Sequence, residues 1–280
     1  MSTLLPDDIE EIDLSNKKLT CLPDLSRFYN LKLLNCSNNQ LTSLPQLNAT
    51  LEKLYCSFNR LTSLPPLNKN LKELYCANNQ LTTLPQMNVN LLQLYCYTNC
   101  LTTLPPFNKN LQNVCCDENN LISLPLFNQD LKSLSCNNNN LVNLPPLNTN
   151  LRSLYCYNNL LTSLPPLNTN LRTLYCYNNI LTTLPLLPPS LENFIYYANP
   201  LEYILTFDGS DNIKNIKNKI QILYNFRHLY YSLKFKKRLR DWLWVRVREP
   251  KIREKYSIGN LIKLLVGHED EDLDELLHTW

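Results

Sequence analysis

Glycine is the residue that this sequence lacks most, with three glycines among 280 residues against 18 prolines. Glycine adopts positive φ at no steric cost, and most tight turns depend on it. Proline instead fixes φ and removes a backbone donor. We therefore expect extended connections and proline-set corners, with the turns built from residues other than glycine.

Long apolar runs and a targeting segment are also missing. No stretch approaches the roughly 18 to 20 apolar residues that a membrane-spanning helix needs. The N-terminus, MSTLLPDDIEEIDLS, is acidic and is broken by Pro6, so it does not fit a secretory signal. Hydrophobic residues make up 44% of the chain, which is ordinary for a folded protein. We expect a soluble protein that stays in the reducing cytoplasm.

Histidine is scarce, and none stands near the cysteines. The three histidines, His228, His268 and His278, all follow the last cysteine, Cys176. A cysteine or serine nucleophile in the first part of the chain would therefore lack a histidine base. The sequence also has no glycine-rich phosphate loop and no obvious carboxylate cluster. It predicts a protein that is not an enzyme, with no catalytic residues, no metal site and no cofactor.

The sequence is rich in one pattern that repeats every twenty residues. Leucine recurs at four positions of the unit, with asparagine and proline at fixed places between them. The columns run from Leu31 to Leu191, from Leu34 to Phe194, from Leu41 to Leu201, from Leu44 to Leu184, from Asn39 to Asn199 and from Pro45 to Pro185. The pattern L-x-x-L-x-C-x-x-N-x-L at this period is typical of leucine-rich repeats.

Each part of the unit has a physical reason. Leucine and cysteine alternate with polar or aromatic residues, which predicts a short strand with one buried side. Stacked units then form a parallel sheet of ten strands, from residues 12–14 to residues 194–196. The segment L-T-x-L-P-x-L-N-x-N is too short and too rich in proline for a helix. The asparagine column is expected to satisfy backbone groups where the chain turns away from the sheet.

The expected fold class is an α/β repeat solenoid. It is a leucine-rich-repeat horseshoe with a parallel concave β-sheet, an extended convex side and a C-terminal helical cap. We expect nine to ten repeats over residues 1–205, followed by the helical cap and tail over residues 206–280.

Most of the cysteines belong to the core pattern. Eight of the eleven occupy the inward strand position, namely Cys36, Cys56, Cys76, Cys96, Cys116, Cys136, Cys156 and Cys176. Cysteine is easily buried, and side chains that point the same way in register are poorly set for a disulfide torsion. We predict a reduced ladder. Cys115 faces outward and is the best candidate for a reactive thiol, although an inert exposed thiol is the simpler interpretation.

The outward strand positions are rich in tyrosine. The predicted partner-binding residues are Tyr55, Tyr75, Tyr95, Tyr97, Tyr155, Tyr157, Tyr175, Tyr177 and Tyr197, with Arg152 and Arg172 at one edge. Tyrosine mixed with serine and asparagine is typical of adaptable binding surfaces. The alternative is that the rings only stack on each other and cover the core. A middle section with Asp117, Glu118, Ser135 and Asn137 separates two tyrosine patches.

Beyond the repeats, the chain predicts helices. Apolar residues recur at helical spacing at Ile213, Ile216, Ile220, Leu223, Phe226 and Tyr230, which predicts an amphipathic helix that seals the last repeat. A second helical stretch, from Leu233 to Leu243, should end before Pro250. The region is basic, with 15 lysines and arginines against three acids in residues 212–265.

Two interpretations of the basic tail stay open. Its lysines and arginines with two tryptophans permit binding to nucleic acid or to a membrane surface. The simpler interpretation is a solvated cap, balanced by the acidic segment 269–275, EDEDLDE, folding back onto it. The closing motif from Leu273 to Trp280 also has helical spacing.

The repeat unit resembles two groups of known proteins. The pattern L-x-x-L-x-x-x-x-N-x-L-T-x-L-P-x-L, and LPLLPPSLENF (184–194) in particular, is similar to the repeat module of secreted bacterial effectors, including invasion-plasmid-antigen ubiquitin ligases. Those ligases carry a catalytic cysteine in a large C-terminal domain, which this chain does not match. The variant L-Y-C-x-N-N-x-L-T-x-L-P-x-L-N-x-N, with LKFKKRLRDWLWVRVREPKIREKY and DLDELLHTW, is more similar to leucine-rich-repeat proteins of mimivirus-type giant viruses. That resemblance implies the cytoplasm of an infected amoeba and no known activity.

The sequence therefore predicts a non-enzymatic scaffold that binds a host or viral protein with its tyrosine-rich concave face. The first alternative is a substrate-recruiting subunit of a ubiquitin ligase or another assembly. The second is binding of nucleic acid or membrane through the tail. Nucleic acid is disfavoured as a partner of the repeats, because residues 1–205 hold 12 basic and 13 acidic side chains.

Overall fold

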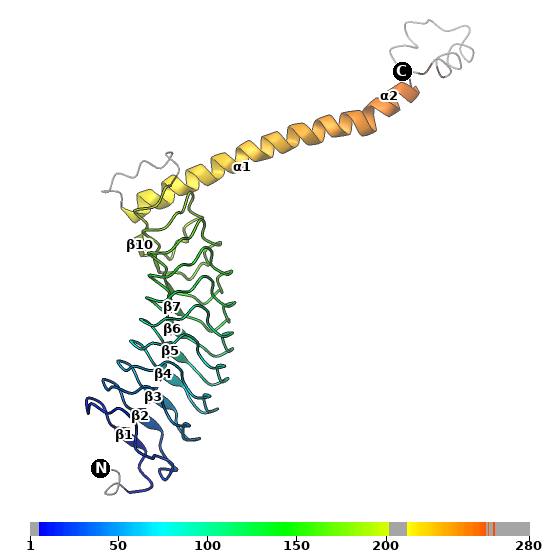
Figure 1. Cartoon of the computed structure of the whole chain (residues 1–280). Helices are drawn as coiled ribbons and strands as arrows, with labels where there is room; N and C mark the ends of the chain where they lie inside the picture. The colour runs from blue at the N-terminus through cyan, green and yellow to red at the C-terminus, as the bar shows by residue number, and fades with distance from the viewer. Residues whose placement is uncertain (1–5, 202–211, 256, 258–259, 261–280) are drawn as a thin grey trace, which may run out of the picture. The chain divides into compact units, whose positions relative to one another are not determined.

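A computed structural model of the chain describes residues 6–201, 212–255, 257 and 260 (Figure 1). The chain divides into two units, residues 1–221 and residues 222–280. The first unit holds the sheet and the beginning of the C-terminal helix.

Ten short strands form one parallel sheet. They are β1 (Glu11–Asp13), β2 (Leu33–Asn35), β3 (Lys53–Tyr55), β4 (Glu73–Tyr75), β5 (Gln93–Tyr95), β6 (Asn113–Cys115), β7 (Ser133–Ser135), β8 (Ser153–Tyr155), β9 (Thr173–Tyr175) and β10 (Asn193–Ile195). The strands lie in chain order, as Figure 1 shows. Equivalent residues pair in register, as Leu34 does with Leu54 and Leu54 with Leu74. The predicted parallel solenoid of ten strands is confirmed.

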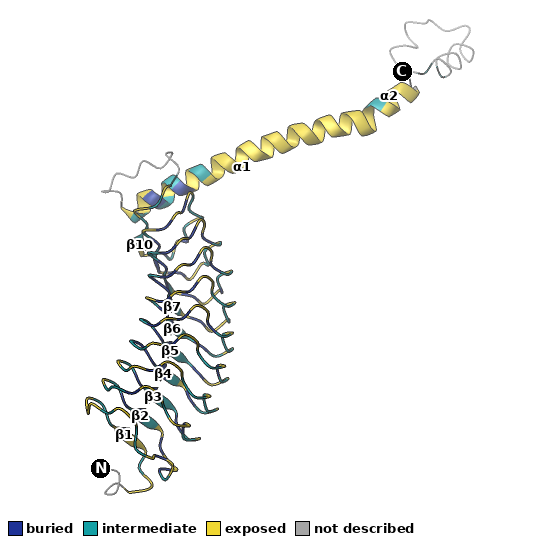
Figure 2. Cartoon of the chain, viewed as in Figure 1, coloured by how far each residue is buried: buried dark blue, intermediate teal, exposed yellow. Residues whose placement is uncertain are grey.

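The leucine and cysteine columns form one continuous core inside the solenoid (Figure 2). Leu54, Cys56 and Leu61 have no exposed surface, and their equivalents in the neighbouring repeats are buried in the same way. No unit could bury this face alone, so each repeat is stabilised by the repeats on either side of it. The return segments between residues 6 and 201 contain no helix, as their proline content predicted.

The turn that follows each strand is built without glycine. Within residues 6–201, nine equivalent non-glycine positions have φ between 51° and 57°, and they are Asn38, Phe58, Asn78, Thr98, Glu118, Asn138, Asn158, Asn178 and Ala198. The left-handed region costs an ordinary residue about 1–2 kcal/mol, whereas asparagine is one of the few types that visit it routinely. Five of the nine positions carry asparagine, which explains how the chain turns with so little glycine.

Replacing Ala198 by asparagine is expected to stabilise the protein by about 1 kcal/mol. Ala198 has φ 53° and is exposed, so the substitution relieves an unfavourable backbone without removing a buried side chain. The measurement is a shift of the urea midpoint to higher concentration at an unchanged slope. Asn178→Ala, the reverse change at the equivalent position of the preceding repeat, should lower the midpoint. A lower midpoint for Ala198→Asn would contradict this account.

The asparagine column joins each repeat to its neighbour. Asn99 donates from Nδ2 to the carbonyl oxygens of Cys96 and Cys76, both at 3.1 Å. Its Oδ1 accepts the backbone N–H of Leu81 at 3.0 Å. The same three bonds recur along the column, for example at Asn119. Because these side chains are mostly buried, they satisfy backbone groups that water does not reach. The predicted structural role of the column is confirmed.

The first turns of helix α1 (Ile213–Leu243) cover the end of the repeats. Ile216 and Ile220 are buried, and Figure 2 shows buried residues in the first turns of α1. The Lys217 ammonium donates to the carbonyl oxygen of Leu191 at 2.8 Å. Apolar burial and this hydrogen bond together close the open end of the core, so the predicted helical cap is confirmed.

The predicted break into two helices is wrong. α1 continues to Leu243, is followed by a π-helical stretch, η2 (Trp244–Arg248), and then by α2 (Glu249–Lys255). Pro250 does not end the helix, because it lies in the first turn of α2, directly after the π-helical widening. A proline is tolerated in the first turn of a helix, because the backbone N–H that it lacks would have no partner within the helix there.

The predicted amphipathic pattern holds only for the first turns of α1. Beyond Gln221 the apolar side chains are spread around the helix rather than gathered on one side. Phe226 and Tyr230, which were predicted to cover the last repeat, are 69% and 53% exposed. The predicted acidic fold-back at 269–275 and the closing motif 273–280 lie outside the described residues.

Candidate functional site

The outer face of the sheet presents three columns of side chains. In the third repeat they are Lys53, Tyr55 and Ser57, and we call the surface made by these columns the sheet face. All of the predicted tyrosines lie on it, and all are half-buried except Tyr197, which is 63% exposed. The sheet face is therefore a fixed surface whose aromatic side chains remain accessible on one side.

The tyrosines stack in two groups along the sheet face. In the first group, the ring centroids of Tyr75 and Tyr95 lie 4.4 Å apart with planes 17° apart. In the second group, the rings of Tyr157 and Tyr177 are 4.4 Å apart at 9°, and Tyr197 stacks on Tyr177 at 4.9 Å. The stacking that was predicted as the alternative to binding is thus present, and it rigidifies rings that are still partly exposed.

The remaining tyrosine pairs meet edge to face. Tyr55 and Tyr75 do so at 4.8 Å, and Tyr155 and Tyr175 at 5.2 Å. The hydroxyl of Tyr55 donates to the Glu73 carboxylate at 2.8 Å, and burial together with this bond raises the pKa of Tyr55. Burial likewise raises the pKa of Tyr75 to about 12. These hydroxyls stay protonated at neutral pH and act as neutral polar groups.

A slot interrupts the tyrosine column between the two groups. The equivalent positions on β6 and β7 carry Cys115 and Ser135, whose side chains are much smaller than a tyrosine ring. An open depression of about 460 Å³ lies at this point. Its lining residues are Tyr95, Asn113, Val114, Cys115, Asp117, Ser133, Ser135, Asn137, Tyr155, Tyr157 and Tyr175. The slot thus has aromatic side chains at both ends and a polar floor.

A network of hydrogen bonds fixes Asp117 on the floor of the slot. Its Oδ2 accepts from the Ser135 hydroxyl at 2.8 Å and from the Cys115 thiol at 3.2 Å. Its Oδ1 accepts the backbone N–H of Asn137 at 2.8 Å. Asn137 in turn donates to Ser135 at 3.0 Å and accepts the N–H of Tyr157 at 3.1 Å. The carboxylate is therefore held in one position by three donors.

Cys115 agrees with the simpler interpretation, an inert thiol, although it is half-buried rather than exposed. Burial and the neighbouring Asp117 carboxylate raise the pKa of Cys115 to about 12. Since the thiolate is the nucleophile, this thiol is protected from reaction at neutral pH. All eleven cysteines are free thiols in the structure, and burial raises the pKa of every member of the ladder.

The structure brings only part of the predicted site together. Tyr95, Tyr155, Tyr157 and Tyr175 line the slot, while Tyr55, Tyr75, Tyr97, Tyr177 and Tyr197 lie elsewhere on the sheet face. Arg152 and Arg172 precede their strands and are exposed, with Arg172 lying 4.0 Å from Glu192. They belong to the rim and do not line the slot.

Sequence reasoning missed the first outer column of the sheet face. Asn113 and Ser133 in this column form part of the slot floor. The signal was the period of two, because these residues stand two positions before Cys115 and Ser135 and must point to the same side of the sheet.

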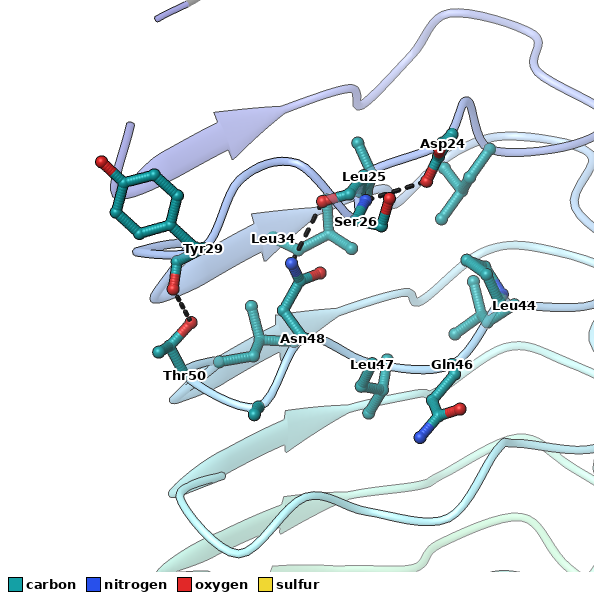
Figure 3. A pocket seen from close by; sticks show the side chains of 14 residues that line it. Asp24, Leu25, Ser26, Tyr29, Leu34, Leu44, Gln46, Leu47, Asn48 and Thr50 are labelled. Atoms are coloured by element: carbon teal, nitrogen blue, oxygen red, sulfur yellow. Dashed lines mark hydrogen bonds between the residues drawn. The ribbon is translucent and has the colours of Figure 1, made fainter. Parts of the chain in front are cut away.

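A second hollow, of about 550 Å³, lies at the loops of the first repeats (Figure 3). Its polar groups are already engaged, since Asn48 donates to the carbonyl oxygen of Leu25 at 3.1 Å and Thr50 to that of Tyr29 at 3.1 Å. Ser26 donates its N–H to Asp24 at 2.9 Å. The bonds of Asn48 and Thr50 join neighbouring loops and that of Ser26 closes a turn within one loop, as Figure 3 shows. These polar groups therefore serve the framework of the first repeats.

Comparison with known proteins agrees with the repeat pattern. A family model described as leucine-rich repeats in two copies matches residues 49–86 and 149–189. A leucine-rich-repeat domain of a Shigella effector is 33% identical, over 55% of this chain and 70% of that domain, at a TM-score of 0.50. The chain belongs to the leucine-rich-repeat proteins.

Two further solved structures resemble this leucine-rich-repeat protein. YopM, a leucine-rich effector from Yersinia pestis, is 32% identical over 68% of this chain and 61% of the YopM chain, at a TM-score of 0.61. The functional domain of InlJ from Listeria monocytogenes, which includes a cysteine ladder, is 28% identical over 70% of this chain and 45% of that chain, at a TM-score of 0.62. The predicted similarity to bacterial effector repeats is confirmed. None of these three is viral, so the giant-virus origin stays a prediction.

No curated protein matches the sequence. In the described part of the chain, no helix has both the length and the apolar content that a bilayer crossing requires.

Proposed function

We propose that this leucine-rich-repeat protein is a non-enzymatic scaffold that binds a partner protein through the tyrosines of its sheet face. The observation that carries the proposal is the pair of stacked tyrosine groups, which present half-exposed rings in fixed positions. Rigid aromatic side chains lose little entropy on binding, and buried aromatic anchors supply most of the affinity in protein interfaces. Arg152 and Arg172, both exposed, would contribute to the rim.

The resemblance to effector repeats supports a partner from a host cell, met in its cytoplasm. YopM is described as an effector, and its similarity covers 68% of this chain. A host-cell partner is also what the predicted giant-virus origin would imply. The class of partner proposed here, a protein, is the same for both origins.

The proposal is tested by changing Tyr155, Tyr157, Tyr175 and Tyr177 to serine together and capturing partners from amoeba and mammalian lysates. Quantitative mass spectrometry should show specific partners of the original chain depleted about tenfold or more, since each lost aromatic anchor weakens binding by 1 kcal/mol or more. Circular dichroism first establishes that the variant folds.

The matched control changes Ile122, Val142, Leu160 and Ile180 to serine. These apolar side chains are exposed, whereas the four tyrosines are half-buried, and they lie outside the strands. The control should keep the partners. A partner list that is the same for the original chain and the tyrosine variant contradicts the proposal. Ubiquitin-ligase components among the partners would favour the substrate-recruiting alternative.

The basic helix gives a weaker case for membrane or nucleic acid. An interfacial helix needs a distinct apolar face, and α1 beyond Gln221 has none. Its exposed lysines and arginines still allow nucleic acid, which stays a prediction. Capture that depends on the helix would fall steeply between 50 and 200 mM salt.

A further inference from the structure

The slot in the sheet face carries a more specific inference, which rests on the proposed function. We propose that it receives an arginine side chain of the partner protein, with Asp117 as the counter-charge and Tyr95 and Tyr155 as aromatic walls. The shape of the slot, its charge and its polar lining each support this ligand class.

The shape of the slot fits one long side chain and its immediate neighbours. Tyr95 on β5 and Tyr155 on β8 stand three strands apart, which is about 14 Å between backbones. Between them the tyrosine column is occupied by two small side chains, Cys115 and Ser135. An extended segment that crosses the tyrosine rings could therefore lower one residue into the slot without displacing either ring.

The charge of the slot is negative and uncompensated. Asp117 is the only ionisable carboxylate among its lining residues. Among the residues that the structure describes, no lysine or arginine pairs with it. Glu118 stands next in the chain and accepts the Thr98 hydroxyl at 2.9 Å. An anionic ligand such as phosphate would be repelled here, whereas a cation would be attracted.

Asp117 also retains acceptor capacity. A carboxylate offers about four lone-pair directions, and three donors already engage it, from Ser135, Cys115 and Asn137. These donors fix the carboxylate without neutralising its charge. A further donor that carries a positive charge would complete its hydrogen bonding, and such bonds are stronger than those between neutral groups.

The aromatic walls favour arginine over lysine. A guanidinium group is planar, stacks on tyrosine faces and donates in several directions at once. The floor offers side-chain oxygens for those further donors, at Asn113 and Ser133. An ammonium group would satisfy Asp117 but would use the walls and the floor less fully.

The test uses the full chain and a defined probe, the peptide acetyl-Ala-Ala-Arg-Ala-Ala-amide. Its twin replaces arginine by citrulline, which has nearly the same shape but no charge. Binding is followed by NMR through the ring signals of Tyr95 and Tyr155. The arginine peptide should bind about tenfold or more tightly than the citrulline peptide and shift both rings. Equal binding of the two peptides, or none of either, would overturn the inference.

Two variants impair the slot, one by removing its charge and one by filling it. A third variant serves as the control. Asp117→Asn removes the charge, and Ser135→Tyr restores a ring at a position where Tyr155 stands one repeat on. Each should weaken the arginine peptide about tenfold or more. Asn35→Tyr adds a ring in the same column on β2, away from the slot, and should leave binding unchanged. Undiminished binding to both slot variants would overturn the inference.

The two proposals fail separately. If the fourfold tyrosine variant loses its captured partners while Asp117→Asn keeps them, the sheet face binds proteins but the slot does not bind an arginine of the partner. If the tyrosine variant keeps all partners, the proposed function fails, whatever the peptide experiment shows.

Discussion

Raising the pH from 8 to about 10 under reducing conditions is expected to unfold the protein, because the cysteine ladder must stay protonated in the core. Burial raises the pKa of Cys36 and of Cys176 to about 12, and that of the six ladder members between them well above the usual value. In the unfolded chain these thiols would titrate near pH 8.5, the usual value for cysteine.

The sign of the effect follows from linkage. The folded pKa is higher than the unfolded one, so the stability is fully present below about pH 8.5 and is lost as the pH rises toward 12. Each thiol contributes a loss of about 2 kcal/mol between pH 8 and pH 10. Eight such thiols exceed the roughly 5–15 kcal/mol by which proteins are stable.

The measurement is the urea midpoint at pH 8, 8.5 and 9 with a reductant present, below the pH at which the chain is expected to unfold without urea. A triple variant, Cys96→Ala, Cys116→Ala and Cys136→Ala, removes three of the eight ladder thiols. Between pH 8 and pH 9 the free energy of unfolding of this variant should fall by about 2 kcal/mol less than that of the original chain. The same pH dependence for both chains would show that the thiols do not cause the alkaline unfolding.

Replacing Asn119 by alanine is expected to lower the free energy of unfolding by about 3 kcal/mol. Its Oδ1 accepts the N–H of Leu101 at 2.9 Å, and its Nδ2 donates to the carbonyl oxygens of Cys96 and Cys116 at 3.1 Å. The substitution leaves the buried N–H of Leu101 without its acceptor. The two carbonyl groups each keep one donor, from Asn99 and Asn139. Nδ2 also donates to the carbonyl oxygen of Asp117 at 3.0 Å. The loss is therefore one unsatisfied donor and three hydrogen bonds to carbonyl oxygens.

Asn120→Ala is the matched control, because its side chain is exposed and its backbone N–H, which the substitution keeps, bonds to Leu101 at 2.9 Å. This variant should unfold within about 0.5 kcal/mol of the original chain. Equilibrium urea unfolding of both variants at pH 7 measures the difference. If Asn119→Ala lowers the free energy of unfolding no more than Asn120→Ala does, the asparagine column does not stabilise the stacking of the repeats.

The core could be predicted residue by residue, because a fixed period leaves each column one possible place. If all repeats have the same conformation, the side chains of Leu54 and Cys56 must point into the core. Both residues are fully buried. The C-terminal helix was less predictable. Whether Pro250 ends a helix depends on how the preceding turn is wound, and the widening at Trp244–Arg248 leaves no mark in the spacing of apolar residues.

The candidate site shows a different limit. The tyrosine columns and the small residues between them were visible in the sequence, at Cys115 and Ser135. That these small residues leave a slot, instead of a gap filled by the rings on either side, depends on how Tyr95 and Tyr155 stack on their own neighbours. The hydrogen bonds that hold Asp117 likewise join its side chain to the next repeat, through the Ser135 hydroxyl and the Asn137 backbone N–H. The repeat period does not predict the geometry of these bonds.

The constant register of the repeats has an evolutionary consequence. Each unit from β2 to β9 brings its own strand, its own buried cysteine and its own asparagine, and it meets both neighbours in the same way. Unequal recombination between nearly identical coding units can therefore add or delete one unit without creating a new kind of contact in the core. One such event on either side of Cys115 would widen or close the slot by a whole strand spacing, about 4.8 Å. Recognition can thus change in steps while the framework is inherited intact.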